Sequence, residues 1–277
     1  MKARIKFQKY GAMKFVGHLD VMRYFQKAFR RANIDSEYSK GFSPHQIMSF
    51  AAPLGVGLTS DGEYLDVQLL SAQEPDIMIE RMNAVITEGF RIIGYRPLLE
   101  AEANTKTVTA MSLVASADYL VSLKDGYPIR EDINSPENFQ KAFEEFMQLP
   151  EIVIDKKTKK SEKEVDIKAM ITLVAFSEEE YANKRRSTLQ VHLLEGQEAG
   201  NDNLADSAAE VYENGIKLYL QVDTGSAANL KPELVMEAFS EYLGIPYNRF
   251  AWQVHRLEVY TRDGETGKLA ALDQVER

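Results

Sequence analysis

The sequence has no cysteine, and this absence excludes several kinds of site together. Without thiolates, the chain cannot form disulfides, thiolate zinc sites, iron–sulfur clusters or cysteine nucleophiles. Its four histidines leave little for an all-histidine metal site. No stretch reaches about 18 uncharged apolar residues, and no apolar segment follows the charges at positions 1–7, so neither a membrane span nor a signal peptide is predicted. We therefore expect a cytoplasmic protein with no cofactor and no membrane partner.

The motifs of the common enzyme classes are also missing. The chain has no phosphate-binding loop, dinucleotide fingerprint, Ser–His–Asp signature or zinc-ligand spacing. An enzymatic role is therefore uncertain, and a non-catalytic role is the stronger expectation. What is present is typical of a globular protein: 277 residues, of which 44% are apolar and 27% charged. This length suits two domains better than one.

Charge is distributed unevenly along the chain. Residues 1–50 contain ten basic and three acidic side chains, a net charge of +7, whereas the remaining 227 residues carry −16. This asymmetry suggests that a polyanion or an acidic partner binds near the N-terminal segment. Alternatively, the two parts neutralise each other within one folded body, because the net charge of the whole chain is −9.

The hydrophobic pattern of the first hundred residues predicts an α+β domain with a ferredoxin-like (split βαβ) plan. The clearest helix is expected at residues 18–32, because apolar side chains recur there every three or four positions. These apolar positions are Leu19, Met22, Phe25, Phe29 and Ala32. A second helix is expected at 75–88. The expected strands span residues 4–10, 34–38, 47–52, 63–69 and 90–96.

The second half of the chain repeats this plan loosely, with an elaborated antiparallel sheet. Helices are expected at 135–149 and 231–243, and strands at 111–123, 151–155, 164–176, 187–194, 216–222 and 254–262. Residues 195–214 are acidic and poor in large apolar side chains, which predicts a long loop. The resulting division is a basic-faced domain at 1–100, a second α+β domain at 108–262 and a frayed C-terminal tail at 263–277.

One side of the first expected helix is a candidate phosphate-binding surface. Arg23, Lys27 and Arg30 are four and three residues apart, so they lie on one side of the helix together with Asp20. Such a row of cations can follow a nucleic-acid backbone, and binding would weaken as salt rises because condensed counterions are released. The alternative is an ordinary solvated helix face that carries an Asp20–Arg23 ion pair.

The loop at residues 38–45, with the sequence YSKGFSPH, is the second candidate. It combines hydroxyls, a cation, aromatic rings and a histidine with Gly41, which allows the backbone to approach a ligand closely. Phe42 could stack on a base while Lys40 meets a phosphate. A loop of this composition could equally be an ordinary turn between strands.

His18 and His45 form the candidate catalytic pair. Two histidines on neighbouring elements could act as acid and base near neutral pH, as metal-free ribonucleases require. Together with Asp20 they could also meet at a metal, although three ligands without regular spacing are a weak indication. The alternative is that His18 and His45 are capping or core residues. His192 and His255 lie in alternating segments and are interpreted as sheet residues.

These segments resemble the radical SAM-linked protein family of bacteria. The resemblance is dense over residues 3–70, where the chain contains KFVGHLDVMR at 14–23, YSKGFSPH at 38–45, PLGVG at 53–57 and EYLD at 63–66. It continues weakly to about residue 170 and fades afterwards. Gly17 stands where a serine is expected, and Gln46 where a basic or small residue is usual.

The resemblance implies a bacterial cytoplasmic protein encoded beside, or fused to, a radical SAM enzyme. The activity of this family is not settled. Because the chain lacks cysteine, any radical chemistry would take place on the partner, which needs thiolates for its [4Fe–4S] cluster. The plan of the first domain is also similar to ferredoxin-like domains of CRISPR repeat-processing endoribonucleases, an analogy of fold alone.

Three hypotheses agree with these observations. The first is a non-catalytic accessory module that binds RNA of the tRNA or rRNA class and presents it to a radical SAM enzyme. The second is a protein–protein adaptor whose basic helix docks on an acidic face of that enzyme. The third is a metal-independent endoribonuclease that uses His18 and His45. The residues expected to bind RNA are His18, Arg23, Lys27, Arg30, Arg31, Tyr38, Lys40, Phe42, Ser43 and His45.

Overall fold

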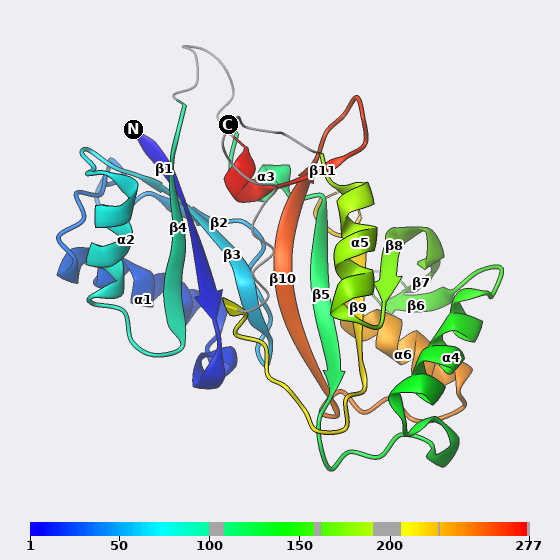
Figure 1. Ribbon diagram of the computed structural model, residues 1–277. Helices are drawn as coiled ribbons and strands as arrows, with labels where there is room; N and C mark the ends of the chain where they lie inside the picture. Colours follow the sequence, from blue (N-terminus) through cyan, green and yellow to red (C-terminus); the bar gives the residue numbers. More distant parts are fainter. Residues whose placement is uncertain (100–107, 158–161, 191–205, 227, 276–277) are drawn as a thin grey trace.

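The computed structural model describes residues 1–99, 108–157, 162–190, 206–226 and 228–275. Within these ranges, both halves of the chain contribute to one sheet of nine strands, and a separate two-stranded hairpin stands beside it. Figure 1 shows this sheet extending across the whole molecule. The mixed α+β class predicted from the sequence is confirmed.

The N-terminal half has the predicted split βαβ plan. Its elements are β1 (Lys2–Lys9), η1 (Gly11–Phe15), α1 (His18–Arg31), β2 (Met48–Phe50), β3 (Thr59–Gln68), α2 (Pro75–Asn83) and β4 (Phe90–Leu98). β1 lies between β4 and β3 and is antiparallel to both, and β2 pairs antiparallel with β3. In place of the strand expected at 34–38, only Ser36 and Tyr38 make isolated bridges.

The C-terminal half follows the same plan with insertions. Its elements are α3 (Ala110–Leu113), β5 (Ser116–Leu123), η2 (Glu131–Ile133), α4 (Pro136–Met147), β6 (Val153–Lys157), β7 (Glu162–Asp166), η3 (Lys168–Met170), β8 (Ile171–Ala175), α5 (Glu178–Thr188), β9 (Lys217–Asp223), α6 (Pro232–Tyr242) and β10 (Trp252–Arg262). β10, β5, β9 and β8 are neighbours in this order, and every pair is antiparallel. The hairpin β6–β7 is the separate two-stranded sheet.

Several expectations for this half need correction. The strand expected at 187–194 is wrong at its start, because 187–188 end α5, a helix that the apolar pattern did not indicate. Residues 191–194 and most of the expected loop at 195–214 lie outside the described residues. The single strand expected at 164–176 is divided into β7, η3 and β8. The strand expected at 111–123 begins only at Ser116, because α3 precedes it.

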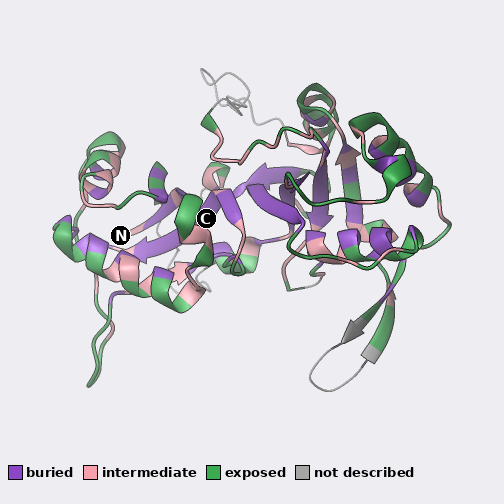
Figure 2. Cartoon of the chain, turned by 90° about the horizontal axis from the view of Figure 1, so that it is seen from below, coloured by how far each residue is buried: buried purple, intermediate pink, exposed green. Residues whose placement is uncertain are grey.

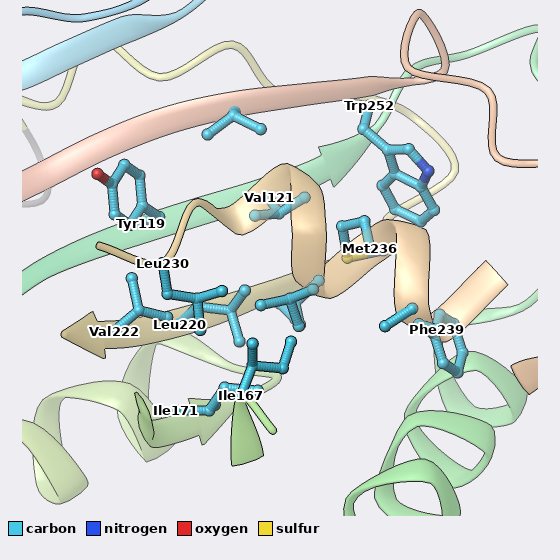
Figure 3. Packing of buried hydrophobic residues seen from close by; sticks show 14 of the residues in the cluster. Tyr119, Val121, Ile167, Ile171, Leu220, Val222, Leu230, Met236, Phe239 and Trp252 are labelled. Carbon is cyan, nitrogen blue, oxygen red and sulfur yellow. The ribbon is translucent and has the colours of Figure 1, made fainter. Parts of the chain in front are cut away.

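Each half has its own apolar core on the same face of the sheet. In the N-terminal half, Ile5 and Phe7 of β1 pack against Phe25 and Phe29 of α1. In the C-terminal half, the core fills the space between β5, β9, β10 and the helices α4 and α6. Figure 3 shows Met236 and Phe239 of α6 within this second core, with Trp252 of β10 at one end.

The opposite face of the sheet is covered by α5. Alternate residues of β5 and β9 separate the two faces: Val121 and Leu220 join the core under α4 and α6, whereas Leu120 and Tyr219 join a small cluster with Tyr181 of α5. Tyr181 also lines a common cavity with Lys6 of β1, whose neighbours Ile5 and Phe7 face α1. Therefore α1, α2, α4 and α6 cover one face, and α5 lies on the other.

β10 joins the two halves through β3. It runs antiparallel to β5 on one side and pairs in parallel with β3 on the other, with His255 opposite Thr59 and Arg256 opposite Ser60. The two strands approach closely at Gly62, where an added Cβ would lie 2.9 Å from the Cα of Glu258. The last long strand of the chain is therefore the link at the centre of the sheet. Figure 2 shows the buried residues continuing from one half into the other.

Residues 263–275, the described part of the expected C-terminal tail, do not form a frayed end. β11 (Leu269–Ala271) pairs with β10, and η5 (Leu272–Gln274) follows it. Leu272 is fully buried, and its carbonyl accepts a hydrogen bond of 2.8 Å from Arg4. The Arg96 side chain donates to the carbonyl of Asp273 at 2.7 Å. The expected tail is thus a strap that fastens the end of the chain to β1 and β4.

None of the helices in the described part of the chain has the length and apolar character needed to cross a membrane.

Candidate nucleic-acid interface

The cationic side of α1 is exposed to solvent, as the residue spacing predicted. Val21, Phe25, Ala28 and Phe29 are buried against the sheet. Leu19, which was expected in the apolar stripe, is instead 61% exposed, because Val21 occupies the inward position of the first turn. The exposed side carries Asp20, Arg23, Lys27, Arg30 and Arg31.

Most of these cations are available to a ligand. Arg23 pairs with Asp20 at 3.2 Å, but both side chains are about two-thirds exposed, so this ion pair contributes little stability. Arg31 donates to the carbonyl of Val85 and lies over the ring of Tyr24. The side chains of Lys27 and Arg30 make no hydrogen bond or ion pair within the described ranges.

The basic surplus of the first 50 residues is divided between the surface and the interior. Of its ten basic side chains, five lie on β1 and η1 and are buried or half-buried: Lys2, Arg4, Lys6, Lys9 and Lys14. Four of the five form ion pairs with Asp66, Glu258, Asp273 or Glu210. The expected neutralisation of charge within the folded body is therefore found for the cations of β1 and η1. The other five cations, on α1 and the following loop, remain on the surface.

The expected loop at 38–45 is the tip of a two-stranded arm formed by residues 37–47. At its root, Glu37 donates its N–H to the carbonyl of Gln68 at 2.9 Å, which attaches the arm to the end of β3. Tyr38 bridges to Gln46, and Ser39 donates its N–H to the carbonyl of His45 at 2.8 Å. Gly41 has a φ of +115°, in the left-handed region that favours glycine, and this permits the tight reversal.

The tip of the arm presents its side chains to solvent. Phe42 is fully exposed, and Tyr38 is 46% exposed. Lys40 and Ser43 are also exposed, and Lys40 has no polar partner in the described part of the chain. Phe42 therefore contributes nothing to the core, and its exposed ring is open to stacking with a partner. The arm follows α1 after only a few residues, so its root lies beside the end of the helix that carries Arg30 and Arg31.

His18 and His45 make no direct contact with each other in the described part of the chain. The ring of His18 packs edge-on against Phe50, with centroids 5.3 Å apart, and lines a cavity of about 10 Å³ with Lys9 and Glu63. His45 is exposed on the arm, where its Nδ1 lies 2.9 Å from the hydroxyl of Ser39. Among the described residues, no hydrogen bond or ring contact joins the two imidazoles. The geometry therefore gives no support to an acid–base pair.

A polar cluster on the opposite face of the sheet was missed by the sequence analysis. His255 is a sheet residue as expected, but it is buried, and its two ring nitrogens lie 2.8 Å from Thr59 Oγ1 and 2.8 Å from Asp61 Oδ2. Asp61 also accepts hydrogen bonds from Gln8, Ser207 and the Ala208 N–H. Each of these hydrogen bonds joins Asp61 to a residue more than 50 positions away, so no local spacing in the sequence indicates the cluster.

This cluster borders a cavity of about 480 Å³ between β1, β4 and α5. Deeper in the sheet, the hydroxyls of Tyr181 and Tyr260 both donate to Asp118, at 2.6 and 2.7 Å, and burial raises the pKa of Asp118. Lys6 bridges Glu258 and Asp273. Because most of these groups are paired with one another, they hold α5 and the C-terminal strap to the sheet.

No group of three or more His, Asp or Glu side chains in the described ranges is arranged to hold a metal ion. Residues 2–232 match a protein family described as an uncharacterized protein conserved in bacteria, DUF2344. This match begins in β1 and ends at the start of α6, so it includes α1 and the arm. No curated protein was found to match the chain.

Proposed function

We propose a function for this chain, which belongs to the DUF2344 family of bacterial proteins. It is a non-catalytic module that binds RNA on α1 and the arm and presents it to a partner enzyme. The observation that carries this proposal is the fully exposed Phe42 beside Lys40 at the tip of the arm, which follows a helix whose outer side carries exposed cations.

The chemistry of this surface suits a single-stranded or looped RNA. Lysine and arginine side chains on a helix can contact successive phosphates, and these contacts give affinity without sequence preference. An exposed aromatic ring can stack on an unpaired base, which a regular duplex does not offer. Arg23, Lys27 and Arg30 supply the phosphate contacts, and Phe42 and Tyr38 supply the stacking. Ser43 and His45 supply hydrogen bonds to base edges.

The covered sheet supports placing RNA on the helix side. Many ferredoxin-like RNA-binding domains use the open face of their sheet, with aromatic side chains that stack on bases. Here the corresponding face of β1 carries Arg4, Lys6 and Gln8, which are occupied by carboxylates and backbone carbonyls of the strap and of the segment at 206–208. The β1 positions on that face therefore offer no aromatic ring on which a base could stack.

The remaining charge of the chain restricts binding to this surface. The protein as a whole carries −9, and an acidic body repels a polyanion except where cations gather. We expect RNA of the tRNA or rRNA class, whose loops offer unpaired bases beside structured phosphate backbone. This distribution favours recognition of a defined RNA over general adhesion to nucleic acid.

The partner we propose is a radical SAM enzyme. This assignment rests on the resemblance of the N-terminal segments, above all YSKGFSPH and KFVGHLDVMR, to radical SAM-linked proteins. It agrees with the lack of cysteine, because a [4Fe–4S] cluster with thiolate ligands must then belong to another chain. In this arrangement, the chain supplies substrate binding and the partner supplies the chemistry.

The test is binding of purified protein to total small RNA across a series of salt concentrations. We expect the double variant Arg23→Glu/Arg30→Glu to weaken binding at low salt and to reduce the slope of log affinity against log salt by about one for each cation. Phe42→Ala should weaken binding about tenfold, since one stacked base contributes about 1–3 kcal/mol, with little change in the salt slope.

The matched control is Lys141→Glu/Arg186→Glu, which makes the same charge change at exposed positions of α4 and α5. If the control lost binding as strongly as the α1 variant, the attraction would be non-specific and the proposed surface would be wrong. Absence of binding at low salt would reject the RNA function and favour the adaptor. Cleavage of RNA that is lost in His18→Ala would favour the endoribonuclease.

A further inference from the structure

A large groove lies between the two halves, away from α1 and the arm. Its volume is about 1570 Å³, and its walls come from η1 and the segment before β3 on one side and from α6, β10 and the segment before β10 on the other. Small-molecule sites usually enclose about 300–1,000 Å³ and bury most of their ligand. The size of this groove therefore favours a segment of polypeptide over a metabolite.

The groove has an apolar floor and an exposed aromatic rim. Leu58, Ala238 and Val254 form part of the floor. At the rim, Phe15 is 67% exposed and Phe250 is 59% exposed. Exposed apolar side chains that gather around a hollow are typical of a surface that a partner covers.

One wall of the groove is a row of carboxylates. Glu233, Glu237 and Glu241 are spaced four residues apart on α6, so they lie on one side of the helix and all face the groove. None of the three makes an ion pair within the described ranges. One carboxylate oxygen of Glu233 is buried without a hydrogen-bond partner there. Burial and the charges of Glu233 and Glu237 raise the pKa of the neighbouring Tyr247 phenol.

Lys14, Lys124, Lys231 and Arg249 also line the groove, so its unpaired negative charge is concentrated on the α6 wall, and this wall decides what the groove can receive. Unpaired carboxylates in a row attract cations, and a floor of aliphatic side chains with aromatic edges accepts hydrocarbon. A spacing of four residues over two helical turns, about 12 Å, matches basic side chains at the same spacing on a second helix. The chain's own segment at 191–205 contains Glu195, Glu198 and Asp202 and no lysine or arginine, so it lacks the complementary charge.

We infer that this groove docks a basic amphipathic helix of a partner protein. The apolar side of that helix lies on Leu58, Ala238 and Val254, and its lysine or arginine side chains meet the glutamates of α6. The inference is independent of RNA binding, because the groove includes no residue of α1 or the arm and attracts the opposite sign of charge. The two surfaces would allow the protein to hold an anionic substrate and a cationic partner segment at the same time.

The test uses a synthetic helical peptide with leucine at positions i, i+3, i+4 and i+7, lysine elsewhere and a dansyl group at one end. Binding is measured by fluorescence anisotropy at physiological salt. Trp252 is the single tryptophan of the chain and lines the groove, so energy transfer from it to the dansyl group reports where the peptide binds. We expect saturable binding with energy transfer, weakened at least tenfold by Glu237→Lys/Glu241→Lys.

The matched control is Asp76→Lys/Glu80→Lys, which reverses two exposed carboxylates at the same spacing on α2. Its affinity for the peptide should stay within twofold of the unmodified protein. An equal loss in both variants, or binding without energy transfer, would overturn the inference by showing general attraction to an acidic protein. No effect of the Glu237→Lys/Glu241→Lys change would also overturn it, because the α6 glutamates would then not contribute to peptide binding. Displacement of the peptide by a single-stranded RNA oligonucleotide would assign the groove to nucleic acid instead.

Discussion

Asp61 is the residue on which the buried polar side of the sheet converges. Its carboxylate accepts hydrogen bonds from Gln8 at 3.0 Å, His255 at 2.8 Å, Ser207 at 2.5 Å and the Ala208 N–H at 2.9 Å. A carboxylate can only accept, so His255 donates to it from Nε2, while Nδ1 of the same ring lies 2.8 Å from the hydroxyl of Thr59. Asp61 thus connects β1, β3, β10 and the segment that starts at residue 206.

Stability should depend on the ionisation of Asp61. Burial alone would raise its pKa, but the hydrogen bonds and charge of His255, together with the bonds from Ser207 and Ala208, outweigh burial and hold the pKa below its ordinary value. The stabilising contribution of the Asp61 carboxylate is therefore complete above about pH 4, which is the pKa of this group in the unfolded chain. It is lost as pH falls through the lower pKa of Asp61 in the folded protein. Asp61→Asn should lower the free energy of unfolding by about 2 kcal/mol at pH 7. The difference should shrink in urea titrations below pH 4, and a difference that is constant with pH would contradict this explanation.

Gly62 is required by the approach of β10 to β3. A Cβ at this position would lie 2.9 Å from the Cα of Glu258 and 3.0 Å from the carbonyl oxygen of Leu257, and backbone cannot move aside as a flexible side chain can. Gly62→Ala should therefore destabilise the protein by about 1–3 kcal/mol, as overpacking does in other buried sites. Thermal unfolding measures the effect. Gly264→Ala is the control, because its Cβ would meet open space, and equal losses in both variants would exclude a steric cause.

At the scale of elements, the strap formed by β11 and η5 closes the polar face of the N-terminal half. Leu272→Ala should cost about 2–5 kcal/mol, since the side chain is fully buried and its loss leaves a cavity. The urea midpoint measures this loss. The neighbouring Gln274 lies at the end of η5 and is exposed, so Gln274→Ala should leave the midpoint unchanged. A neutral effect of Leu272→Ala would show that the strap does not contribute to the core.

Sequence periodicity predicted the elements that bury an apolar stripe and missed those that dock through polar contacts. Each of the helices α1, α4 and α6 has one apolar side and one polar side, and each lies close to its expected range. α5 is barely amphipathic and buries only Tyr181, so its attachment depends on the bonds of Tyr181 and Arg185 to Asp118 and Tyr260. The strap escaped prediction for a related reason: its three-residue strand is too short to show a period.

For the candidate surface, the sequence could predict which side chains are exposed only where their place on one helix or loop decides it. The outward cations of α1 follow from helix geometry, and the exposure of Phe42 follows from its place in a Gly- and Pro-containing loop. The ion pairing of Arg4 and Lys6 could not be predicted in this way, because their partners Asp66 and Glu258 are 62 and 252 residues away in the sequence. The groove beside α6 was also missed, since its walls come from both halves and meet only in the folded chain.

At the scale of the whole molecule, the shared sheet should make the two halves unfold together. β10 pairs with strands of both halves, and the buried ion pair of Arg256 with Glu63 crosses the same junction. Trp252 reports on the C-terminal half alone, whereas far-UV circular dichroism reports on both. We expect coincident urea transitions by the two methods. A dichroism transition that separates into two steps, only one of which coincides with the tryptophan signal, would show that the halves are independent.

The place of β10 also affects how the protein is made. A ribosome delivers the N-terminal half first, and this half can complete β4, β1 and β3 while the rest of the chain is still being synthesised. Until residues 252–262 emerge, Thr59 and Ser60 on β3 have no neighbour on that side, and an unpaired strand edge invites pairing with other chains. Premature termination near the end of the message therefore removes the centre of the sheet rather than its margin. Such products should be insoluble or rapidly degraded. The central sheet therefore forms only in chains that include β10.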